Sequence, residues 1–377
     1  MRFLHSADWH LGKTLCGTSL LDDQAHALEQ VEAMVRDTRP HALVVAGDLY
    51  DRAVPAREAV SLLDGFLNRV VRDLGVPTLL IAGNHDSPER LGFASGFLRE
   101  RGLFVAGPLS GDAEPVVLGD TAFHLLPYAD PSAARFAFQQ EGLHSHQEVL
   151  QAQVARALAR QPKGRHAVAV AHAFVRGGLT SESELGLVVG GTGEVDAALF
   201  DAFAYVALGH LHAPQEAGRP GLRYAGSLLK YSASEAAHVK ALSLVELGAD
   251  GQVRTEPLPL SPRRDLRRLR GRFEELMAGI PGSCEDYLFL ELTDEGPVVD
   301  AMARLRRRYP NVLALQAGGA LQAAGELPEG ADPRSLDPAD LFDRFLGETQ
   351  GGPMSAEERR IFQEVAGPVF LSEEELP

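Results

Sequence analysis

The sequence predicts an α/β protein whose core is a two-sheet sandwich flanked by helices. Three observations lead to this prediction. Over the first 82 residues, apolar and amphipathic segments follow one another as strand, helix, strand, helix and strand, which implies right-handed crossovers and parallel pairing. Between residues 104 and 127 the pattern shortens into small strands separated by Gly and Pro, as in the antiparallel or mixed part of a sandwich. Beyond Pro262, a second alternation of helix and strand predicts a small additional α/β domain.

Hydrophobic periodicity defines the elements of the larger domain. Helices are indicated where apolar residues recur every three or four positions, and strands where short apolar runs end at Gly or at a polar residue. The expected elements are strand 2–7, helix 22–39, strand 41–46, helix 55–74, strand 78–82, helix 146–159, and strands 167–171, 205–208, 223–226, 240–247 and 252–257. The stretch 174–196 is rich in Gly, Ser and Glu and predicts a long loop beside the site.

The remainder of the chain divides into a small domain and a helical end. Three prolines in 257–262 predict a linker, followed by a basic helix at 265–277, strand 287–292, helix 298–309 and strand 312–316. A polar stretch, 318–338, precedes two short helices that start near Asp337 and at the capping box Ser355-x-x-Glu358. These helices carry apolar faces that they cannot bury alone, so either a partner or the body of the protein must cover them. The expected domains are 1–258, 259–320 and 321–377.

Composition restricts the class of protein. A chain of 377 residues exceeds the usual size of a single core. Two cysteines cannot form a disulfide framework, and no apolar run approaches the ~18 residues of a membrane span, so we expect a cytoplasmic protein that does not enter membranes. The net charge of −16 argues against a protein that coats nucleic acid along its whole surface.

Polar side chains of the kinds that bind metals follow five apolar segments at the point where each segment ends. Open α/β sheets place their ligands at the carboxyl ends of their strands, so such residues meet in space. One Gly-Asp or Asp-x-His alone would be an ordinary turn, but five strand ends with the same chemistry predict a shared ion site. The five are Asp8-Trp9-His10, Gly47-Asp48, Gly83-Asn84-His85-Asp86, His172, and Gly209-His210-Leu211-His212.

The sequence resembles the calcineurin-like metallophosphoesterases, whose motif series it carries complete and in family order over about 215 positions. The series is Asp8-x-His10, Gly47-Asp48-x-x-Asp51-Arg52, Gly83-Asn84-His85-Asp86, His172 and Gly209-His210-x-His212. Within this superfamily, the stretches 4–12 and 224–227 resemble the bacterial SbcD nucleases. The resemblance implies a metallophosphoesterase sandwich, a DNA-capping domain after residue 258, and C-terminal helices that dock on an SbcC-like ATPase.

The chemistry of phosphodiester hydrolysis gives these residues roles. Two metal ions about 4 Å apart can activate water and neutralise phosphoryl charge together, and one carboxylate must bridge them. We expect Asp48 to be the bridge. The family pattern implies Asp8, His10 and His212 at one ion and Asn84, His172 and His210 at the other. Manganese is the family's usual activator, although iron or cobalt would suit the same imidazole, carboxylate and amide ligands.

His85 and Asp51 are the expected catalytic pair. The family pattern places His85 against the scissile phosphate, where a protonated imidazole stabilises charge or protonates the leaving oxygen. A carboxylate bonded to the other ring nitrogen would fix the tautomer, and we expect Asp51 to provide it. Archaeal and eukaryotic relatives have a histidine where Asp51 stands, so the phosphatase-like Asp-His pair is the better guide to mechanism.

Outside the motifs, two groups of basic residues are candidates for phosphate contacts. His238 and Lys240 precede the last core strand and could touch phosphate. A dense arginine group on the predicted basic helix is either a solvated face or a surface that tracks the DNA backbone without reading sequence. Its members are Arg263, Arg264, Arg267, Arg268 and Arg270. The histidines outside the motif series, such as His5, are expected to be structural or solvent-exposed.

The leading functional hypothesis is a manganese-dependent DNA nuclease of SbcD type. It would act as a 3′–5′ exonuclease on double-stranded ends and as an endonuclease on single strands and hairpins, as a homodimer within a heterotetramer with an SbcC-like ATPase, close to the nucleoid. The alternative is a metallophosphoesterase acting on small phosphodiesters or phosphoproteins. A noncatalytic scaffold is a third possibility, against which the intact ligand series argues. The capping domain and the apolar C-terminal helices favour the nuclease, since a small-molecule phosphatase needs neither.

Overall fold

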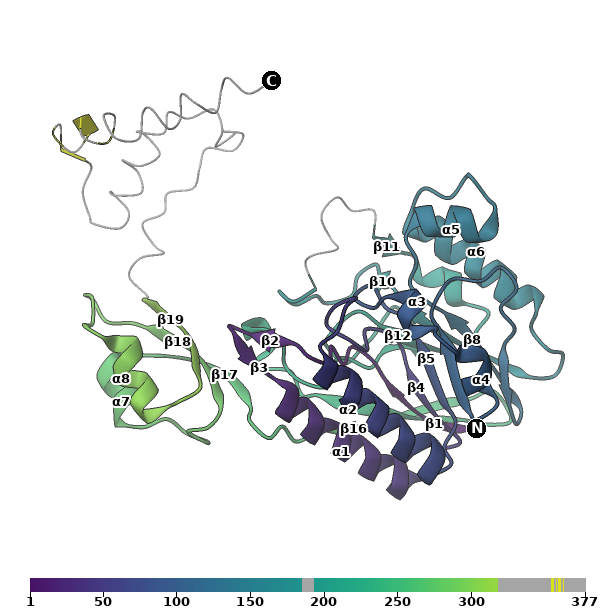
Figure 1. Ribbon diagram of the computed structural model, residues 1–377, viewed down its shortest axis with the longest axis horizontal. Helices are drawn as coiled ribbons and strands as arrows, with labels where there is room; N and C mark the ends of the chain where they lie inside the picture. Colours follow the sequence, from purple (N-terminus) through teal and green to yellow (C-terminus); the bar gives the residue numbers. More distant parts are fainter. Residues whose placement is uncertain (185–192, 318–353, 356, 358, 361, 363–377) are drawn as a thin grey trace. The chain divides into compact units, whose positions relative to one another are not determined.

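The computed structural model describes residues 1–184, 193–317, 354, 355, 357, 359, 360 and 362 (Figure 1). The chain divides into two compact units. The larger unit comprises Met1–Arg267 together with Glu285–Tyr287. The smaller unit comprises Arg268–Cys284 and Leu288–Pro377.

Two six-stranded sheets form the larger unit. The first has the order β16-β15-β1-β4-β5-β6, in which β1, β4, β5 and β6 are parallel and β15 and β16 are antiparallel. The predicted parallel core of this half is therefore confirmed. Its strands are β1 Arg2–Ser6, β4 Ala42–Val45, β5 Thr78–Ile81, β6 Leu103–Ala106, β15 Ala241–Leu247 and β16 Val253–Pro259.

The second sheet has the order β13-β14-β12-β9-β8-β7, with β8, β9, β12 and β14 parallel and the two edge strands antiparallel. Its strands are β7 Val116–Leu118, β8 Thr121–Leu126, β9 His166–His172, β12 Tyr205–Gly209, β13 Gln215–Glu216 and β14 Leu222–Tyr224. The short pairs β2 Thr14–Leu15 with β3 Thr18–Ser19, and β10 Phe174–Val175 with β11 Glu194–Val195, lie in connecting loops.

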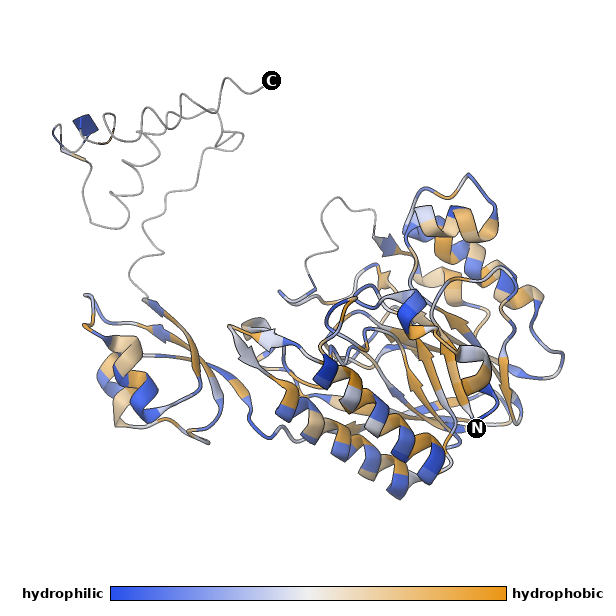
Figure 2. Cartoon of the chain, in the orientation of Figure 1, coloured by the Kyte–Doolittle hydropathy of each residue, from blue (hydrophilic) through white to orange (hydrophobic). Residues whose placement is uncertain are grey.

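An apolar core between the two sheets joins them into a sandwich. Alternate residues of both sheets point into it, among them Phe3 and Val44 from the first and Val168 and Tyr205 from the second. The ring of Phe3 packs edge-on at 5.3 Å from Phe123 and 5.5 Å from Tyr205. Figure 2 shows these strands in orange, as expected for strands buried on both faces.

Helices cover the outer faces of the sandwich. α1, Leu21–Thr38, and α2, Arg57–Leu67, pack against each other and bury an apolar stripe, while their outward faces are polar (Figures 1 and 2). α6, His146–Ala159, covers the second sheet. The shorter helices are α3 Pro88–Leu91, α4 Ser95–Arg99 and α5 Pro131–Phe138. The helix predicted at 55–74 is α2 followed by a π-helical turn, Asn68–Asp73.

The predicted linker 257–262 overlaps the end of β16. Ser243 pairs with Pro257 and Ala241 with Pro259, so the prolines continue the strand. β16 is the outermost strand of its sheet, and an edge strand tolerates residues that lack an N–H donor.

The smaller unit has a three-stranded sheet and two helices around a core of its own. The sheet order is β17-β18-β19, with strands Leu266–Gly271, Tyr287–Leu292 and Val312–Ala317. α7, Phe273–Ala278, and α8, Ala301–Arg308, bury Phe273, Leu276 and Leu305 against Leu288 and Leu290.

The prediction of a basic helix from residue 265 was wrong, because β17 occupies Leu266–Gly271 and the helix begins only at Phe273. Arg268 and Arg270 are both exposed and lie two positions apart, which places them on one face of a strand. Both pair with Glu291 of the neighbouring strand, at 3.4 and 3.1 Å. Cross-strand ion pairs of this kind stabilise a sheet, and the arginine run matches a strand period better than a helical one.

The two C-terminal helices expected near residues 337 and 355 lie outside the described residues, apart from 354, 355, 357, 359, 360 and 362. Within the described part of the chain, no helix has both the length and the apolar character needed to cross a membrane.

Candidate metal centre

The loops that follow β1, β4 and β5 meet the ends of β9 and β12 across the sandwich. The Asp8 N–H donates to the Gly47 carbonyl at 3.1 Å, and the His10 N–H donates to the Asp48 carbonyl at 2.9 Å. The second sheet joins them because the His210 N–H donates to the Asp8 carboxylate at 2.9 Å. Seven predicted side chains therefore share one site: Asp8, His10, Asp48, Asn84, His172, His210 and His212.

Within this site the side chains form two groups with Asp48 between them. On one side, the Nε2 atoms of His10 and His212 lie 3.1 Å apart. On the other, Asn84 Oδ1 lies 2.8 Å from His172 Nε2 and 3.2 Å from His210 Nδ1.

The Asp48 carboxylate reaches both groups with one oxygen. Its Oδ2 is 3.6 Å from His10 Nε2 and 3.5 Å from His172 Nε2. Its other oxygen, Oδ1, accepts the His85 N–H at 2.9 Å. The family resemblance implies such a division of ligands between two ions, and that assignment stays a prediction.

Four of these residues adopt backbone conformations that residues other than glycine rarely adopt. The φ angles are 53° at Asp8, 45° at His10, 52° at Asp48 and 108° at His210. Left-handed conformations of this kind cost on the order of 1–3 kcal/mol each and concentrate at functional sites. The loops therefore hold these side chains in strained positions that packing alone would not select.

Two glycines permit the close approach of the loops. A Cβ atom at Gly83 would stand 2.1 Å from Asp48 Oδ1, and one at Gly209 would stand 1.9 Å from the Ala46 carbonyl oxygen. Such distances exclude any side chain at either position. Each glycine lies directly before ligand residues, so the backbone can bring those residues into the site.

The electrostatics of the site fit a divalent cation. Burial raises the pKa of Asp8 well above its ordinary value, and the charge of Asp48 raises it further. Burial lowers the pKa of His10 and His210 well below the ordinary value, and it also lowers the pKa of His172. Neutral imidazoles are the ligand form of histidine, and a cation offsets the repulsion between the two carboxylates.

The donor atoms also fit. Among the residues that the structure describes, the buried His10 Nδ1 has no hydrogen-bond partner. Its other ring nitrogen, Nε2, lies against the Nε2 of a second imidazole, His212. Three carboxylate or imidazole ligand atoms, from Asp8, His10 and Asp48, lie within 4.8 Å of one another. Imidazole, carboxylate and amide oxygen together suit a divalent metal ion.

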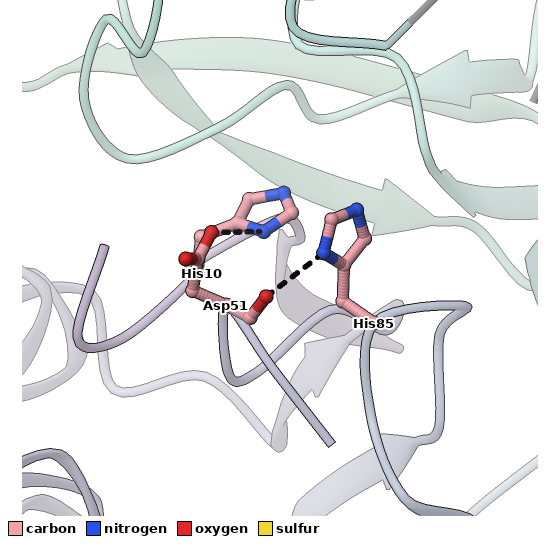
Figure 3. A group of neighbouring side chains, drawn as sticks. All are labelled: His10, Asp51 and His85. Carbon is pink, nitrogen blue, oxygen red and sulfur yellow. Dashed lines mark hydrogen bonds and ion pairs between the residues drawn. The ribbon is translucent and has the colours of Figure 1, made fainter. Parts of the chain in front are cut away.

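The predicted catalytic pair, His85 and Asp51, lies next to His10 (Figure 3). His85 Nδ1 is 2.9 Å from the main-chain oxygen of Asp51, so the backbone makes the contact that we expected from the carboxylate. The carboxylate instead pairs with Lys13 Nζ at 2.7 Å and lies 3.8 Å from His10 Nδ1. The ring of His85 stands edge-on to that of His10, with centroids 4.7 Å apart.

Asp86 belongs to one of the sequence motifs, but sequence reasoning gives it no role. The Asp86 carboxylate accepts N–H groups from Gly83 at 2.9 Å, Leu49 at 3.1 Å and Tyr50 at 2.9 Å. Burial and then the charge of Asp48 raise its pKa to about 7. Asp86 therefore ties the loops after β4 and β5 together beneath the ligands.

Of the three charged residues around His212, sequence reasoning missed Glu235 and Glu184 and expected a different contact from Lys240. Glu235 and Lys240 form a buried pair beside the ring, and Glu184 accepts the His212 N–H. Lys240 is a candidate for a phosphate contact on sequence grounds, but it is buried and donates inward to the His212 carbonyl and to Ser227 Oγ, each at 2.8 Å. No local pattern marks these residues in the sequence, because Glu235 and His212 are 23 positions apart.

The predicted arginine group does not form an unpaired basic surface. Each member has a carboxylate partner, and these pairs are Arg263 with Asp22, Arg264 with Asp23, Arg267 with Asp286, and Arg268 and Arg270 with Glu291. These partners reduce the positive field that a phosphate backbone would feel. A DNA contact by this group stays a prediction.

Comparison with known proteins agrees with this geometry. Residues 1–214 match the calcineurin-like phosphoesterase family, and residues 262–350 match the type 5 capsule protein repressor C-terminal domain of SbcD proteins. The chain is 31% identical over 367 residues to the SbcD component of the SbcCD nuclease from Staphylococcus saprophyticus, covering 97% of each chain.

A dimetal phosphatase from Danio rerio also aligns in structure, with 15% identity and a TM-score of 0.41, over 70% of this chain and 99% of that one. The matched domains and the full-length relative decide the family. The chain belongs to the calcineurin-like phosphoesterases and, within them, to the SbcD nuclease subunits.

Proposed function

We propose that this chain is the manganese-dependent nuclease subunit of an SbcCD-type complex that hydrolyses phosphodiester bonds in DNA at two metal ions. Its substrates would be double-stranded ends, degraded 3′ to 5′, and single strands or hairpins, cut internally. A role in DNA repair and recombination, in the cytoplasm next to the nucleoid, follows from that substrate choice. Two observations support the proposal: the arrangement of the candidate metal ligands, and the similarity to the SbcD subunit of a nuclease from Staphylococcus saprophyticus.

One observation carries the proposal: the Asp48 carboxylate lies between two groups of ligand atoms. Its Oδ2 is 3.6 Å from His10 Nε2 and 3.5 Å from His172 Nε2, so one oxygen can serve two cations. Asp8, His10 and His212 would hold the first ion, and Asn84, His172 and His210 the second. When bound, such a pair lowers the pKa of water and offsets charge on the phosphoryl oxygens.

The chain itself supplies proton transfer and orientation. The Asp51 carbonyl accepts the Nδ1–H of His85, so in the protonated ring Nε2 carries the proton that can be donated to a phosphoryl or leaving oxygen. Lys13 holds the Asp51 carboxylate at 2.7 Å and steadies the loop that carries this carbonyl. The His85 ring is half-buried, which leaves it accessible to a substrate.

Two protein partners belong to the proposal. The name SbcCD given to the relative indicates a two-component assembly, so an SbcC-like ATPase is the expected partner, docked through the segment after residue 336. A second copy of this chain is the other partner. Phe93 and Phe97, near α3 and α4, are 80% and 82% exposed, and two large apolar side chains so close in the chain offer a surface for a contact between copies.

A nuclease assay on the purified, chelator-stripped chain tests the proposal. With manganese added, linear duplex and hairpin DNA should be cut while a closed circular duplex is spared, and magnesium should support less activity. Asp48→Asn, purified in parallel, controls for contaminating nucleases. If bis-p-nitrophenyl phosphate is hydrolysed but DNA of every form is left intact, the chain is a small-molecule phosphodiesterase instead.

The ATPase partner is tested separately. Removing the residues after Leu336 should abolish co-purification with an SbcC-like ATPase and leave nuclease activity unchanged. A truncated chain that still co-purifies would rule out docking through the C-terminal segment.

A further inference from the structure

His212 is held differently from His172, a predicted ligand of the other ion. Its Nδ1 lies 3.0 Å from Glu235 Oε1, so a carboxylate accepts a hydrogen bond from the ring N–H. His172, in the second group of ligands, has its Nδ1 2.9 Å from the main-chain carbonyl of Ala46 instead. His212 therefore hydrogen-bonds to a charged carboxylate, whereas His172 hydrogen-bonds to an uncharged peptide carbonyl.

The carboxylate of Glu235 is buried at considerable cost. Its side chain is fully buried, and its second oxygen, Oε2, is 2.5 Å from Lys240 Nζ. Lys240 has its other two protons on the His212 carbonyl and on Ser227 Oγ, each at 2.8 Å. Apolar residues of similar volume often stabilise a fold as well as a buried ion pair does, so fold stability alone gives weak grounds for this pair.

Two residues of the loop after β10 complete the surroundings of His212. Ser183 Oγ donates to Glu235 Oε1 at 2.7 Å and lies 2.9 Å from His212 Nδ1. Glu184 accepts the main-chain N–H of His212. The ring is thus fixed at Nδ1, and the only ring nitrogen left is Nε2, which faces His10 Nε2 at 3.1 Å.

We propose that Glu235, with its charge balanced by Lys240, is the positioning residue of the first cation site. It accepts the Nδ1–H of His212, which fixes the tautomer whose Nε2 lone pair is free to bind an ion, and its charge would make that nitrogen a stronger ligand. The inference rests on the proposed metal site. It predicts that the first ion, held in part by His212, depends on Glu235, whereas the second ion does not.

A matched pair of triple variants separates the hydrogen bond from the buried charge. Both carry Ser183→Ala and Lys240→Met, which remove the nearest alternative acceptor and the lysine charge, and both keep the Glu184 carboxylate, 3.9 Å from His212 Nδ1. One adds Glu235→Gln, whose amide oxygen can still accept the Nδ1–H, and the other adds Glu235→Leu, which cannot. The measurement is calorimetric titration of manganese into chelator-stripped protein, with the thermal midpoint of the metal-free protein as a check on folding.

The Gln variant should keep both manganese sites, with the first weakened several-fold at most. The Leu variant should bind the first manganese about 10–100-fold more weakly, the usual loss when the partner of a ligating imidazole is removed, and the second as in wild type. Equal affinities in the two variants would overturn the inference. If wild-type protein itself bound no manganese, the proposed metal site would fail instead, so the two failures can be told apart.

A second measurement observes the ring proton directly in wild-type protein. In wild-type, metal-free protein labelled with ¹⁵N at histidine, the His212 signals, assigned by their loss in His212→Asn, should report a proton on Nδ1 and none on Nε2. A proton on Nε2 would contradict the role assigned to Glu235.

Discussion

The Nδ1 atom of His85 lies 2.9 Å from the main-chain oxygen of Asp51, so the peptide backbone orients this imidazole. Two substitutions separate the ring from the carboxylate. His85→Gln should lower the turnover of hairpin DNA by ~10²–10⁴-fold, because proton donation is lost. Two manganese ions should still bind, because His85 is not one of the predicted metal ligands. Turnover at saturating manganese and calorimetry on the same preparation measure the two effects.

Asp51→Asn is the matched variant, because it keeps the carbonyl that holds His85 and removes only the charge beside Lys13 and His10. We expect its turnover to fall by less than about tenfold, well short of a lost acid or base. A loss as large as that of His85→Gln would mean that the carboxylate takes part in the chemistry.

Asp48→Asn should reduce manganese binding to one ion per chain at most and abolish hydrolysis. An amide oxygen can still bind a cation, but it lacks the charge that offsets repulsion between two cations. Metal content measured by mass spectrometry, together with the nuclease assay, tests this. Asp64→Asn, at an exposed carboxylate of α2, is the control and should match wild type. Two ions and normal activity in Asp48→Asn would remove the bridging role.

His5 should make the metal-free protein less stable as the pH falls below about 6.5. It lies buried between the Tyr205 hydroxyl at 3.0 Å and the Leu208 carbonyl at 3.2 Å. Burial lowers its pKa to about 3, only partly opposed by the bond to Leu208, so the unfolded chain binds the extra proton first.

From this group, stability is fully present above pH 6.5 and is lost progressively towards pH 3, at about 1.4 kcal/mol per pH unit. Urea unfolding at pH 7 and pH 5 should therefore show the advantage of wild type over His5→Gln shrinking by about 2 kcal/mol. An advantage that stays constant with pH would show that the pKa of His5 is the same in the folded and the unfolded protein.

The arginines of β17 can be tested through the salt dependence of DNA binding. If Arg268 and Arg270 contact phosphates, replacing both by alanine should reduce the slope of log K against log[salt] by up to about 2. Glu291→Gln removes the carboxylate that both arginines share and should then raise affinity. Unchanged slopes in both variants would assign these arginines to the sheet alone.

Phe93 and Phe97 should support self-association. Replacing both by serine is expected to shift sedimentation from dimer to monomer without loss of metal binding. Phe136→Ser is the control, because Phe136 is 89% exposed on a different helix, α5. A double variant that remains dimeric would place the contact between copies elsewhere.

The sequence predicted the sandwich, and the gathering of the candidate ligand side chains at one edge of it, because both depend on short patterns. An apolar run followed by Gly-Asp or Gly-Asn-His is visible locally, and parallel strands bring such endings to one edge without further information. The crossovers of the first half followed for the same reason, and β1, β4 and β5 pair in parallel as predicted.

Long-range contacts and ambiguous periods were beyond sequence reasoning. Glu235 reaches His212 across 23 positions, and the residues between them give no periodic signal. The arginine run at 263–272 is dense in charge, which favours a helix, and its period of two is easily overlooked. The contact of Asp51 was expected from its side chain, because sequence carries no sign that a main-chain oxygen takes its place.

Because Gly83 and Gly209 have no Cβ atom, their place in the fold has a consequence for engineering. Main chain packs against main chain and against Asp48 at these points, so the scaffold sets the spacing of the candidate ligand residues. Changing which metal ion the protein binds should require exchanging the ligand side chains. Insertions or deletions in the surrounding loops should abolish metal binding before they alter the choice of metal.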